Sequence, residues 1–466
     1  MLGATEKESG SSANGLESQG QSAAGRNLRQ ALVIAYDFPP RRTSGVYRTT
    51  NLTRNLIQFG WLPTVLTVRG RPDDLEDRTL LQDFPSGVLV ERARDLKISG
   101  WENKAAVGIR AAGGLQSHYK DIRQPVWDRW VRAAGHFVRS TFYFPDDTVG
   151  WVPQALAKAI ELHRQHRFDL IYTTSPPRSA PVIGLLLKFL LGVPWIAEFR
   201  DPWYPPERPW RRRFERLLLT RILRKADKVV TVCKGLAREF EQSYGTPREK
   251  LAVVNNGFEE RDFCGGDGKP SDLLAPGYFH FCHFGTVYPG FSGRFFDGLK
   301  ELLQESPDLK DRVRVNVIGF PDEAVRQYAA QSDLEQVVQL HGFVDHPRAL
   351  AAMKSADCLL LFLGNREVAR LAIAGKTYEY LRAGTPILAV TYDGDTTELV
   401  NQGRAGWVVN PEDTATIKEV LRTILQSGRR GNLPRPANPE FVQQFRYDRL
   451  AGKLARVFDS VLDHDS

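Results

Sequence analysis

The sequence predicts an α/β protein built from two doubly wound domains that face each other across a cleft. Apolar runs of the buried-strand type alternate with segments of helical spacing along most of the chain. A stretch rich in Gly, Asp and Pro, residues 264–276, divides this alternation into two series. A chain of 466 residues is also too long to fold around a single core.

The expected domain boundaries follow from composition. Residues 1–27 contain almost no large apolar side chains and lack the apolar core of a signal peptide, so we expect a disordered tail. A first domain is expected over 28–265 and a second over 277–440. A last helix, within 441–466, follows a Pro-rich stretch and is expected to reach back to the first domain.

The first domain is expected to begin with a strand–loop–helix–strand unit, which is half of a doubly wound sheet. Its parts are the strand 31–35, the loop 37–45, the helix 46–59 and the strand 64–68. The loop holds one glycine instead of G-x-G-x-x-G, so the dinucleotide-binding fingerprint is absent. Gly45 and Arg48 are expected to face the crevice at the C-terminal ends of the strands.

Charged residues directly follow the later strand 195–197 of the first domain, namely Glu198, Arg200 and Asp201. We expect them to line the crevice. In an alternative interpretation, Arg200 pairs with Asp201 and only anchors the loop. The remaining strands are expected at 169–173, 228–232 and 251–254 in the first domain, and at 279–285, 313–318, 337–340, 358–362, 387–390 and 407–409 in the second.

The stretch from Gly375 to Val390 predicts a short helix that begins at Gly375, ends at Gly384 and is followed by a buried strand. Backbone N–H groups and the helix dipole favour an anion at such a start, and Lys376 shares one helix face with Glu379. This pattern suits a sugar nucleotide, with the diphosphate at the helix start and the ribose hydroxyls against Glu379. The alternative is an ordinary surface helix with a Glu379–Arg382 pair. A P-loop is excluded, because Arg370 stands where that motif requires glycine.

The net charge of +8 is concentrated in two stretches. Residues 205–228 carry nine Arg or Lys against three Asp or Glu, and residues 101–139 carry seven against three. Each stretch is either a solvated face of the protein or a surface that binds an anionic membrane or an anionic acceptor. Within residues 99–147, three aromatic residues indicate a helix that lies on a membrane or packs onto the domain: Trp127, Trp130 and Phe137. No nucleic-acid-binding motif accompanies the charge, so nucleic acid is not an expected partner.

The cysteines indicate a reducing compartment. All four are scattered, without a CxxC pair or clustered histidines, so we expect neither a structural zinc nor disulfides. The longest apolar run, residues 180–197, is interrupted by Lys188, Gly192 and Pro194, which favours a helix and a strand over a membrane span. We therefore expect a cytoplasmic protein, either free or peripheral at the inner face of the membrane.

A possible metal motif occurs at Asp393-Gly394-Asp395, which is formally a DxD. Asp and Gly are also what a simple turn requires, and the motif lies beyond the helix that we assign to the diphosphate. We therefore expect no metal site and no cofactor other than the donor substrate.

Several segments together resemble the GT-B-fold glycosyltransferases of the large retaining family four, over about residues 29–460. The segments are Phe38-Pro39-Pro40 with Gly45, Ser175-Pro176-Pro177, Glu198-Phe199-Arg200-Asp201-Pro202-Trp203, Asn256-Gly257-Phe258, Gly285-Thr286-Val287-Tyr288, His341-Gly342-Phe343-Val344 and Gly375-Lys376-Thr377-Tyr378-Glu379-Tyr380-Leu381. The resemblance implies two Rossmann-like domains. The Glu-Phe-Arg-Asp-Pro-Trp signature is similar to that of a bacterial subgroup that looks like exopolysaccharide or cell-surface glycan transferases.

The resemblance also implies roles for individual residues. Glu379 would hold the donor ribose, while Gly375 and Lys376 would meet the diphosphate with Gly285 and Thr286 nearby. Arg294 would neutralise the departing diphosphate, and Phe343 and Val344 would receive the nucleobase. Gly45 would lie over the donor phosphates with Arg48 near it, and Arg200 and Asp201 would lie on the acceptor side.

Two positions depart from the family pattern. Leu371 stands where the first glutamate of the Glu-x7-Glu motif belongs, and Arg200 occupies the slot of the usual histidine. The expected activity is transfer of a sugar from a nucleotide diphosphate sugar to a glycan or lipid-linked acceptor, with retention and without metal. The alternatives are a catalytically weakened GT-B partner in polysaccharide assembly, or a GT-B phosphorylase or epimerase.

Overall fold

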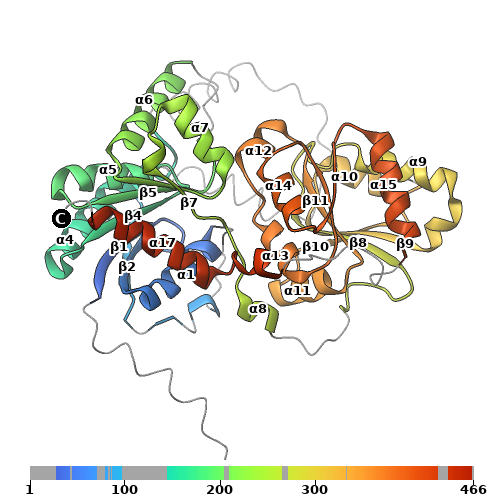
Figure 1. The fold of residues 1–466 in the computed structure, drawn as a ribbon, viewed down its shortest axis with the longest axis horizontal. Coiled ribbons are helices and arrows are strands. Elements are labelled where there is room, and N and C mark those ends of the chain that lie inside the picture. Colours follow the sequence, from blue (N-terminus) through green and yellow to red (C-terminus); the bar gives the residue numbers. More distant parts are fainter. Residues whose placement is uncertain are drawn as a thin grey trace, which may run out of the picture.

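The computed structural model describes residues 28–41, 43, 45–70, 79–81, 84–85, 87–96, 144–203, 209–264, 271–331, 333–428 and 439–463. The predicted tail and the segment around Trp127, Trp130 and Phe137 lie outside these residues. Within them the chain forms two β-sheets, of seven and six strands, placed side by side (Figure 1). Every pair of neighbouring strands is parallel, which confirms the predicted α/β class with two doubly wound units.

The first sheet has the strand order β3-β2-β1-β4-β5-β6-β7. Its strands are β1 (Arg29–Ala35), β2 (Trp61–Val68), β3 (Leu89–Ala93), β4 (Leu170–Ser175), β5 (Trp195–Phe199), β6 (Lys228–Thr231) and β7 (Leu251–Val253). The sequence analysis did not predict β3, because Glu91 and Arg92 interrupt its apolar pattern. Charged side chains of this kind are common on edge strands, and β3 forms one edge of the sheet.

Alternation along β1 gives this sheet two apolar faces. Leu32 and Ile34 pack into one hydrophobic cluster, whereas Ala31 and Val33 pack into another. Helices α1 (Val46–Leu56) and α17 (Tyr447–Leu462) contribute to the second cluster, and the other helices of this domain contribute to the first. These are α4 (Val152–His166), α5 (Ser179–Leu191), α6 (Pro209–Lys225) and α7 (Lys234–Tyr244).

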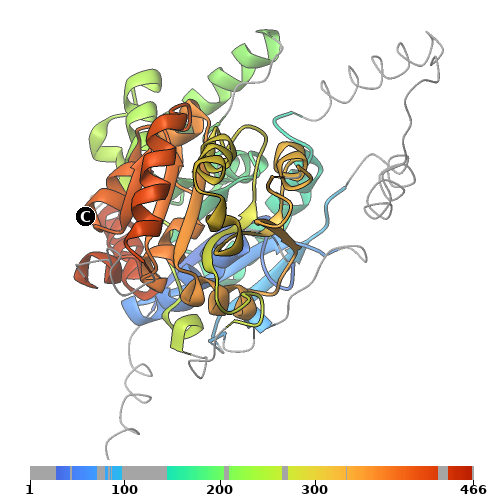
Figure 2. The ribbon, with the colours of Figure 1, turned by 90° about the vertical axis from the view of Figure 1, so that its right-hand side faces the viewer.

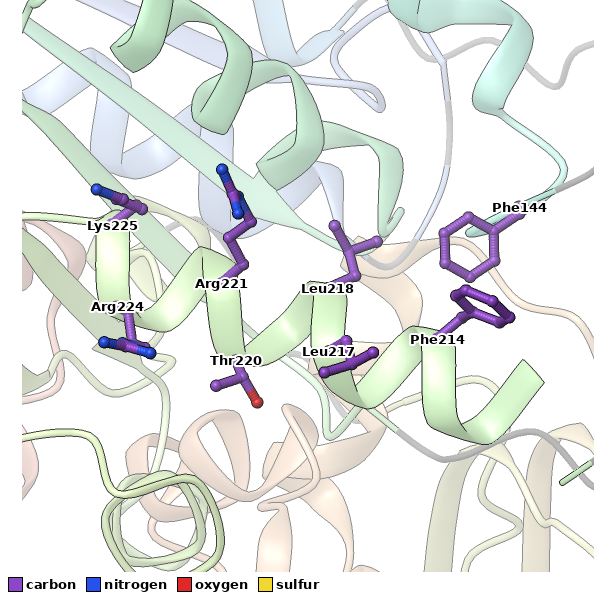
Figure 3. A pocket seen from close by; sticks show the side chains of 8 residues that line it. All are labelled: Phe144, Phe214, Leu217, Leu218, Thr220, Arg221, Arg224 and Lys225. Atoms are coloured by element: carbon purple, nitrogen blue, oxygen red, sulfur yellow. The ribbon is translucent and has the colours of Figure 1, made fainter. Parts of the chain in front are cut away.

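Helix α6 buries one side and exposes an apolar and basic strip on the other. Leu219, Ile222 and Leu223 are buried, whereas Phe214 and Leu217 are 58% and 60% exposed. Figure 3 shows Phe214 and Leu217 beside a hollow of about 890 Å³, with basic side chains further along the same helix. The hollow is lined by Phe144, Phe214, Leu217, Leu218, Thr220, Arg221, Arg224 and Lys225.

The second sheet has the order β10-β9-β8-β11-β12-β13. Its strands are β8 (Phe279–Thr286), β9 (Val313–Phe320), β10 (Val338–Gly342), β11 (Cys358–Leu363), β12 (Ile387–Thr391) and β13 (Gly406–Val409). Its helices are α9 (Phe295–Glu305), α10 (Glu323–Ala329), α11 (His346–Ser355), α12 (Arg366–Leu371), α13 (Lys376–Ala383), α14 (Asp395–Gln402) and α15 (Thr414–Gln426). The short helix α8 (Glu260–Cys264) follows the first sheet.

The chain returns to the first domain at its C-terminal end. Leu450, Leu454 and Phe458 of α17 pack into the core that covers β1, and the indole N–H of Trp61 in β2 donates to Asp459. The single helix expected over 441–462 is wrong, because it is divided into α16 (Pro439–Gln443) and α17. At the break, Phe258 pairs with the chain as a strand would, exchanging backbone hydrogen bonds with Phe445 and Tyr447.

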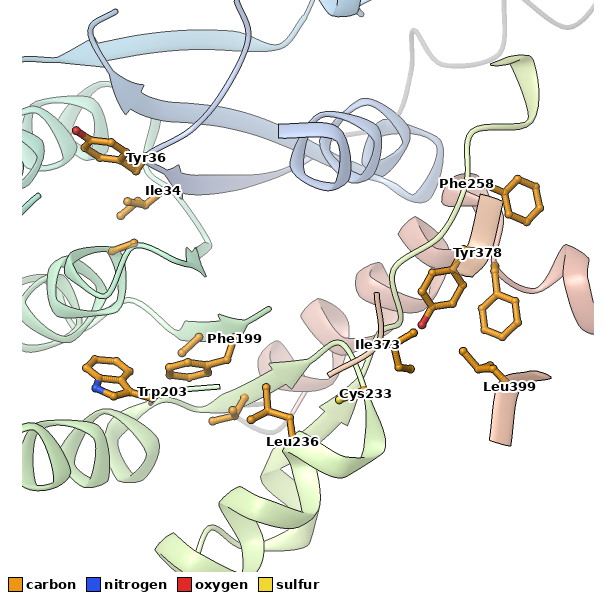
Figure 4. Close-up of a cluster of buried hydrophobic side chains, with 14 of the residues drawn as sticks. Ile34, Tyr36, Phe199, Trp203, Cys233, Leu236, Phe258, Ile373, Tyr378 and Leu399 are labelled. Atoms are coloured by element: carbon orange, nitrogen blue, oxygen red, sulfur yellow. The ribbon is translucent and has the colours of Figure 1, made fainter. Parts of the chain in front are cut away.

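One hydrophobic cluster runs without interruption from the first domain into the second. It joins Phe199 and Leu236 to Ile373, Tyr378 and Leu399 (Figure 4). In Figure 2 the two domains lie one behind the other, with the second in yellow to red. The two domains are therefore packed together through a shared hydrophobic core.

Candidate functional site

A lysine, a histidine and a glycine meet at the C-terminal edge of the second sheet. Lys376 begins α13, and its Nζ lies 3.1 Å from Nε2 of His283 in β8. Gly285, two residues further along β8, has a φ of 92°, a conformation that favours glycine. A Cβ at Gly285 would lie 3.4 Å from Nζ of Lys376. The ammonium group therefore lies directly against the backbone of Gly285.

His283 is neutral, and in this form it accepts a hydrogen bond from Lys376. Burial, together with the Lys376 charge, lowers the pKa of His283 well below its usual value. Its Nδ1 lies 3.0 Å from the carbonyl oxygen of Leu360, which can only accept, so Nδ1 carries the proton and Nε2 accepts from Lys376. Burial in turn lowers the pKa of Lys376 to about 8, while Glu379 acts in the opposite direction. A desolvated cation of this kind gains much by binding an anion.

Helix α13 begins and ends where the sequence predicted. Gly375 is its N-cap and Gly384, with a φ of 69°, is its C-cap. The N–H groups of Thr377 and Tyr378 donate within the first turn, so those of Gly375 and Lys376 are the ones available to meet an anion. A Cβ at Gly375 would meet nothing within 4 Å, so the backbone here is open to a ligand.

Glu379, one turn further along α13, is bonded to a histidine from α11. Nε2 of His346 lies 3.0 Å from Oε1 of Glu379, and Nδ1 of His346 lies 3.1 Å from the hydroxyl of Tyr47 in α1. That hydroxyl donates to Asp262 in α8 at 2.9 Å. The Glu379–Arg382 pair of the alternative interpretation is not formed, because Arg382 pairs with Glu260 instead.

Two aromatic rings stand at the ends of neighbouring strands of the second sheet. Phe320 ends β9 and Phe343 follows β10, and their rings lie stacked, with centroids 6.4 Å apart at an angle of 29°. Both are more than half exposed, as suits a platform for a planar ligand. Val344, predicted to act with Phe343, packs against the core instead. Thr286, the last residue of β8, is exposed.

Arg294 lies at the start of α9, in the loop system that follows β8. Its side chain is exposed, and its backbone N–H donates to the carbonyl of Pro411 beyond β13. Arg294 therefore stands at the same C-terminal edge of the sheet as Gly285 and Lys376, but no contact places it beside them among the described residues.

The structure contradicts the predicted position of Arg48. Its side chain is only 3% exposed and lies beneath the crevice, 2.6 Å from the equally buried carboxylate of Glu198. Arg48 also donates to the carbonyls of Val254 and Asn255. Glu198 was likewise expected to line the crevice and does not. Burial alone would raise the pKa of Glu198, but Arg48 and the hydroxyl of Thr174 outweigh it and lower that pKa.

Arg200 connects two loops of the first domain. Its guanidinium donates to the carbonyls of Gly45 and Pro176, both at 2.7 Å, and to that of Ser175 at 3.3 Å. A Cβ at Gly45 would lie 2.3 Å from Nη1 of Arg200, so a side chain here would displace the guanidinium from its present position. Asp201 is exposed just beyond β5. These residues shape the first-domain side of the cleft, and Arg200 serves there as a clamp on backbone carbonyls.

The Asp393-Gly394-Asp395 segment joins the two domains. Asp395 is buried, and its two oxygens accept from the backbone N–H of Gly235 at 2.6 Å and from Arg238 at 3.0 Å. Asp393 is exposed. Across the described residues there is no group of three His, Cys, Asp or Glu side chains arranged to hold a metal ion.

Sequence reasoning missed four residues of the site, namely Tyr47, His283, Phe320 and His346. His283 stands within an apolar strand pattern, where a polar residue was a usable signal. His346 directly follows Asp345, the N-cap of α11, which puts it at a helix start facing the cleft. No local signal marks Tyr47 or Phe320, because their partners come from distant parts of the chain.

Solved structures share this architecture. The structure of Anabaena HepE in complex with UDP-glucose has a TM-score of 0.60 at 16% identity, over 92% of this chain and 99% of that one. A glycosyltransferase from Rickettsia africae has a TM-score of 0.59 at 15% identity, over 94% and 99% of the two chains. Two doubly wound domains of this kind define the GT-B fold.

Sequence comparison then gives the family. A family described as "Glycosyl transferase 4-like domain" matches residues 43–257, and one described as "Glycosyl transferases group 1" matches residues 287–427. The chain therefore belongs to the GT-B glycosyltransferases of the family-four type.

Curated relatives match this chain over only part of their length. A D-inositol 3-phosphate glycosyltransferase of Streptomyces scabiei is 25% identical over 262 residues, which is 53% of this chain and 56% of that protein. A phosphatidyl-myo-inositol mannosyltransferase of Mycobacterium leprae is 26% identical over 178 residues, 37% of this chain and 46% of that protein. The match thus spans about half the length of these relatives. None of the helices in the described ranges is long and apolar enough to cross a membrane.

Proposed function

We propose that the protein transfers a sugar from a nucleoside diphosphate sugar to a glycan or lipid-linked acceptor, with retention and without a metal ion. The observation that carries this proposal is the pairing of Lys376 with neutral His283 against the backbone of Gly285, one turn from Glu379. A cation, open N–H groups and a carboxylate at this spacing suit a diphosphate attached to a ribose.

Each part of the donor has a matching group. The diphosphate lies at Lys376 and the start of α13, and the ribose hydroxyls donate to Glu379. The nucleobase stacks on the aromatic pair of Phe320 and Phe343. Because negative charge grows on the diphosphate as the sugar leaves, Lys376 stabilises the transition state more than the ground state. Arg294 adds positive charge from the start of α9, so the diphosphate is neutralised without a cation beneath it.

Uridine nucleotides are the first donors to test, since Anabaena HepE was crystallised with UDP and with UDP-glucose. The relatives named for inositol phosphate and phosphatidylinositol suggest a phosphorylated or lipid-linked acceptor. The exposed strip on α6 supports a membrane-bound acceptor. Its apolar half, Phe214 and Leu217, fits acyl chains, and its basic half, Arg221, Arg224 and Lys225, fits anionic headgroups. We therefore propose that the protein acts at an anionic membrane surface.

Adsorption to vesicles tests this placement. The protein is expected to sediment with phosphatidylglycerol vesicles at low salt and to be released at high salt, because exposed charge is screened within about 8 Å at physiological ionic strength. Replacing Leu217 and Arg221 by Ser should reduce adsorption, while Leu190→Ser on α5, an equally exposed leucine, should not. Equal adsorption of all three proteins would contradict the role of α6.

One observation favours a second function, that of a catalytically weakened partner in polysaccharide assembly. Leu371, which replaces the first motif glutamate, is only 4% exposed, and its carbonyl accepts from the thiol of Cys233 in the first domain. Leu371 therefore joins the domains, and its apolar side chain has no group that could hydrogen-bond a sugar. Under this hypothesis the protein binds nucleotide but neither transfers nor hydrolyses the sugar.

The experiment combines binding with turnover. Binding of UDP, GDP and ADP is measured by calorimetry, and release of nucleotide from the matching sugar donors is measured with and without glycan acceptors. Glu379→Gln should weaken binding by about 1.5–3 kcal/mol, the range for a hydrogen bond to a charged group. Glu367→Gln, an exposed glutamate on α12, serves as the control. Binding without turnover would favour the partner, and unchanged affinity in folded Glu379→Gln would remove Glu379 from the site.

A further inference from the structure

The contacts around Glu379 form a chain of three hydrogen bonds that crosses the cleft. It runs from Asp262 through the hydroxyl of Tyr47 and the ring of His346 to Glu379, with heavy-atom distances of 2.9, 3.1 and 3.0 Å. Tyr47 lies in α1 of the first domain, while His346 and Glu379 lie in helices of the second. The chain therefore connects the predicted ribose ligand to the opposite domain.

The number of protons in this chain can be counted. Three hydrogen bonds need three protons, one for each gap between the four groups. The Tyr47 hydroxyl supplies one, and a neutral His346 supplies one more. With both carboxylates ionised, only two protons are then present, so one bond cannot form. A third proton completes the chain, whether it is carried by His346 or by Asp262, whose pKa is raised by burial.

Among the described residues, two carboxylates face His346. They belong to Glu379 on α13 and to Asp262 on α8, the latter 3.9 Å from Nδ1. Asp345 on the same helix accepts from the N–H of Arg348, and Arg348 itself pairs with Asp272. Lys376 on α13 is engaged by His283, and Glu260 is paired with Arg382.

The phenol that faces His346 stays protonated. Burial and the Asp262 carboxylate raise the pKa of Tyr47, and its ring lies 5.1 Å from that of His346. Tyr447 of α17, also buried, adds a weaker effect of the same sign on Tyr47. Of the described groups bonded to or paired with His346, Glu379 and Asp262 are carboxylates and Tyr47 is a protonated phenol.

We propose that Tyr47 and His346 are positioning residues for Glu379, and that one proton shared with Asp262 fixes this carboxylate for the donor ribose. Because His346 is hydrogen-bonded to Oε1 of Glu379, Oε2 is oriented toward the ligand. Since Tyr47 comes from the first domain, the carboxylate is held only in the domain arrangement seen here. The inference rests on the proposed function, because it assumes that Glu379 binds a nucleoside diphosphate.

The proposal predicts the direction in which pH changes the affinity for the nucleotide. The complete chain holds one more proton than the incomplete one, so one of its three bonds is lost as pH rises and Glu379 is held less firmly. Affinity for the nucleotide should fall in the same direction. Loss of the Lys376 charge, with its pKa of about 8, also weakens binding as pH rises. A variant that changes His346 alone separates the two effects.

The test measures the affinity of the tightest binder among UDP, GDP and ADP from pH 5.5 to 8.5. Tyr47→Phe and His346→Phe should each bind about 3- to 10-fold more weakly at low pH, the change expected for one lost hydrogen bond. His346→Gln keeps a donor for Glu379 and should bind well, whereas His346→Phe removes the chain and should show only the pH dependence of Lys376. At saturating donor the turnover rate should change little. Tyr36→Phe, which removes a hydroxyl that donates to Asp95, is the matched control and should resemble the wild type.

The outcomes distinguish the two proposals. If the wild type binds none of the nucleotides, the proposed function fails and this inference fails with it. If the wild type binds but Tyr47→Phe and His346→Phe bind equally well, Glu379 needs no positioning and only this inference is overturned. A His346→Phe variant with the full pH dependence of the wild type would also overturn it. Thermal melting of each variant confirms that it is folded.

Discussion

Nζ of Lys376 lies 3.1 Å from Nε2 of His283, a neutral histidine whose other nitrogen donates to the carbonyl of Leu360. The lysine is thereby held at the edge of the second sheet with a pKa of about 8. Burial of an ammonium group without a carboxylate bonded to it lowers the stability of the protein. The arrangement is therefore explained by what the ammonium binds and not by what it contributes to folding.

The first prediction concerns Lys376 and pH. Between its folded pKa of about 8 and the usual value near 10.5, the unfolded chain binds more protons at this site, so the contribution of Lys376 to stability rises with pH. A bound diphosphate should restore the proton. Calorimetry at pH 8 in buffers of different ionisation enthalpy should therefore show proton uptake on nucleotide binding.

Lys376→Met should lose about tenfold or more in nucleotide affinity without loss of stability at pH 7. Lys418→Met, which removes a partly buried lysine paired with Glu301 and Glu305, is the control. Nucleotide binding without proton uptake, together with normal affinity in Lys376→Met, would place the diphosphate elsewhere.

The second prediction uses the open space at Gly375. Its φ of −55° and ψ of −36° are helical, so alanine is allowed there, and a Cβ would touch nothing in the ligand-free protein. Gly375→Ala should change stability by less than about 0.5 kcal/mol. If the diphosphate approaches this backbone, the methyl group should nevertheless weaken nucleotide binding. Gly428→Ala, remote from the site, shows the cost of a glycine with positive φ. Unchanged affinity in Gly375→Ala would exclude close approach.

The third prediction concerns the buried pair of Arg48 and Glu198. Removing one partner leaves an uncompensated buried charge, so Arg48→Met should lower the free energy of unfolding by about 3–5 kcal/mol. The pKa of Glu198 is lowered in the folded protein, so its contribution is present above its usual pKa and lost as pH falls through the folded value. Urea unfolding from pH 3 to 7 measures both effects. Arg48→Met with Glu198→Leu should be less destabilised than the two single variants predict together. Additive losses would show that the pair is not coupled.

The fourth prediction concerns metal. The carboxylate of Asp395 accepts hydrogen bonds from Gly235 and Arg238 of α7, so its role is to hold α7 against the second domain. Asp395→Ala should lower the free energy of unfolding by about 1–3 kcal/mol, the cost of leaving a buried N–H unpaired. Asp393→Asn should retain activity, and transfer should survive EDTA. Activity that is abolished by EDTA and restored by manganese would contradict the metal-free proposal.

The fifth prediction separates Arg294 from the ground-state ligands. An exposed arginine at the start of α9 should act most strongly when charge develops on the leaving diphosphate. Arg294→Ala should therefore lower turnover by about a hundredfold, with a much smaller effect on nucleotide affinity. Arg312→Ala, which breaks an exposed pair with Asp308, is the control. A loss confined to affinity would make Arg294 an ordinary binding residue.

The sequence by itself determined α13 and the strands around it. Gly384 ends the helix through a left-handed backbone that depends on a few neighbouring residues, and Lys376 and Glu379 share a face because of helical periodicity. The apolar strand runs were equally local, which is why only the charged edge strand β3 was missed. These signals were sufficient for the fold class and for the edge of the sheet that carries the site.

Only the tertiary structure decided which polar groups reach that edge. Arg48 was predicted to line the crevice, but groups that are 150 residues or more away, Glu198 and the carbonyl of Val254, draw it into the interior. Tyr47, its neighbour in sequence, instead crosses the cleft to His346, 299 residues further along the chain. Whether a charged side chain is buried or exposed depends on the partners that distant elements supply, because an ion is stable in the interior only when it is paired. No local pattern in the sequence contains that information.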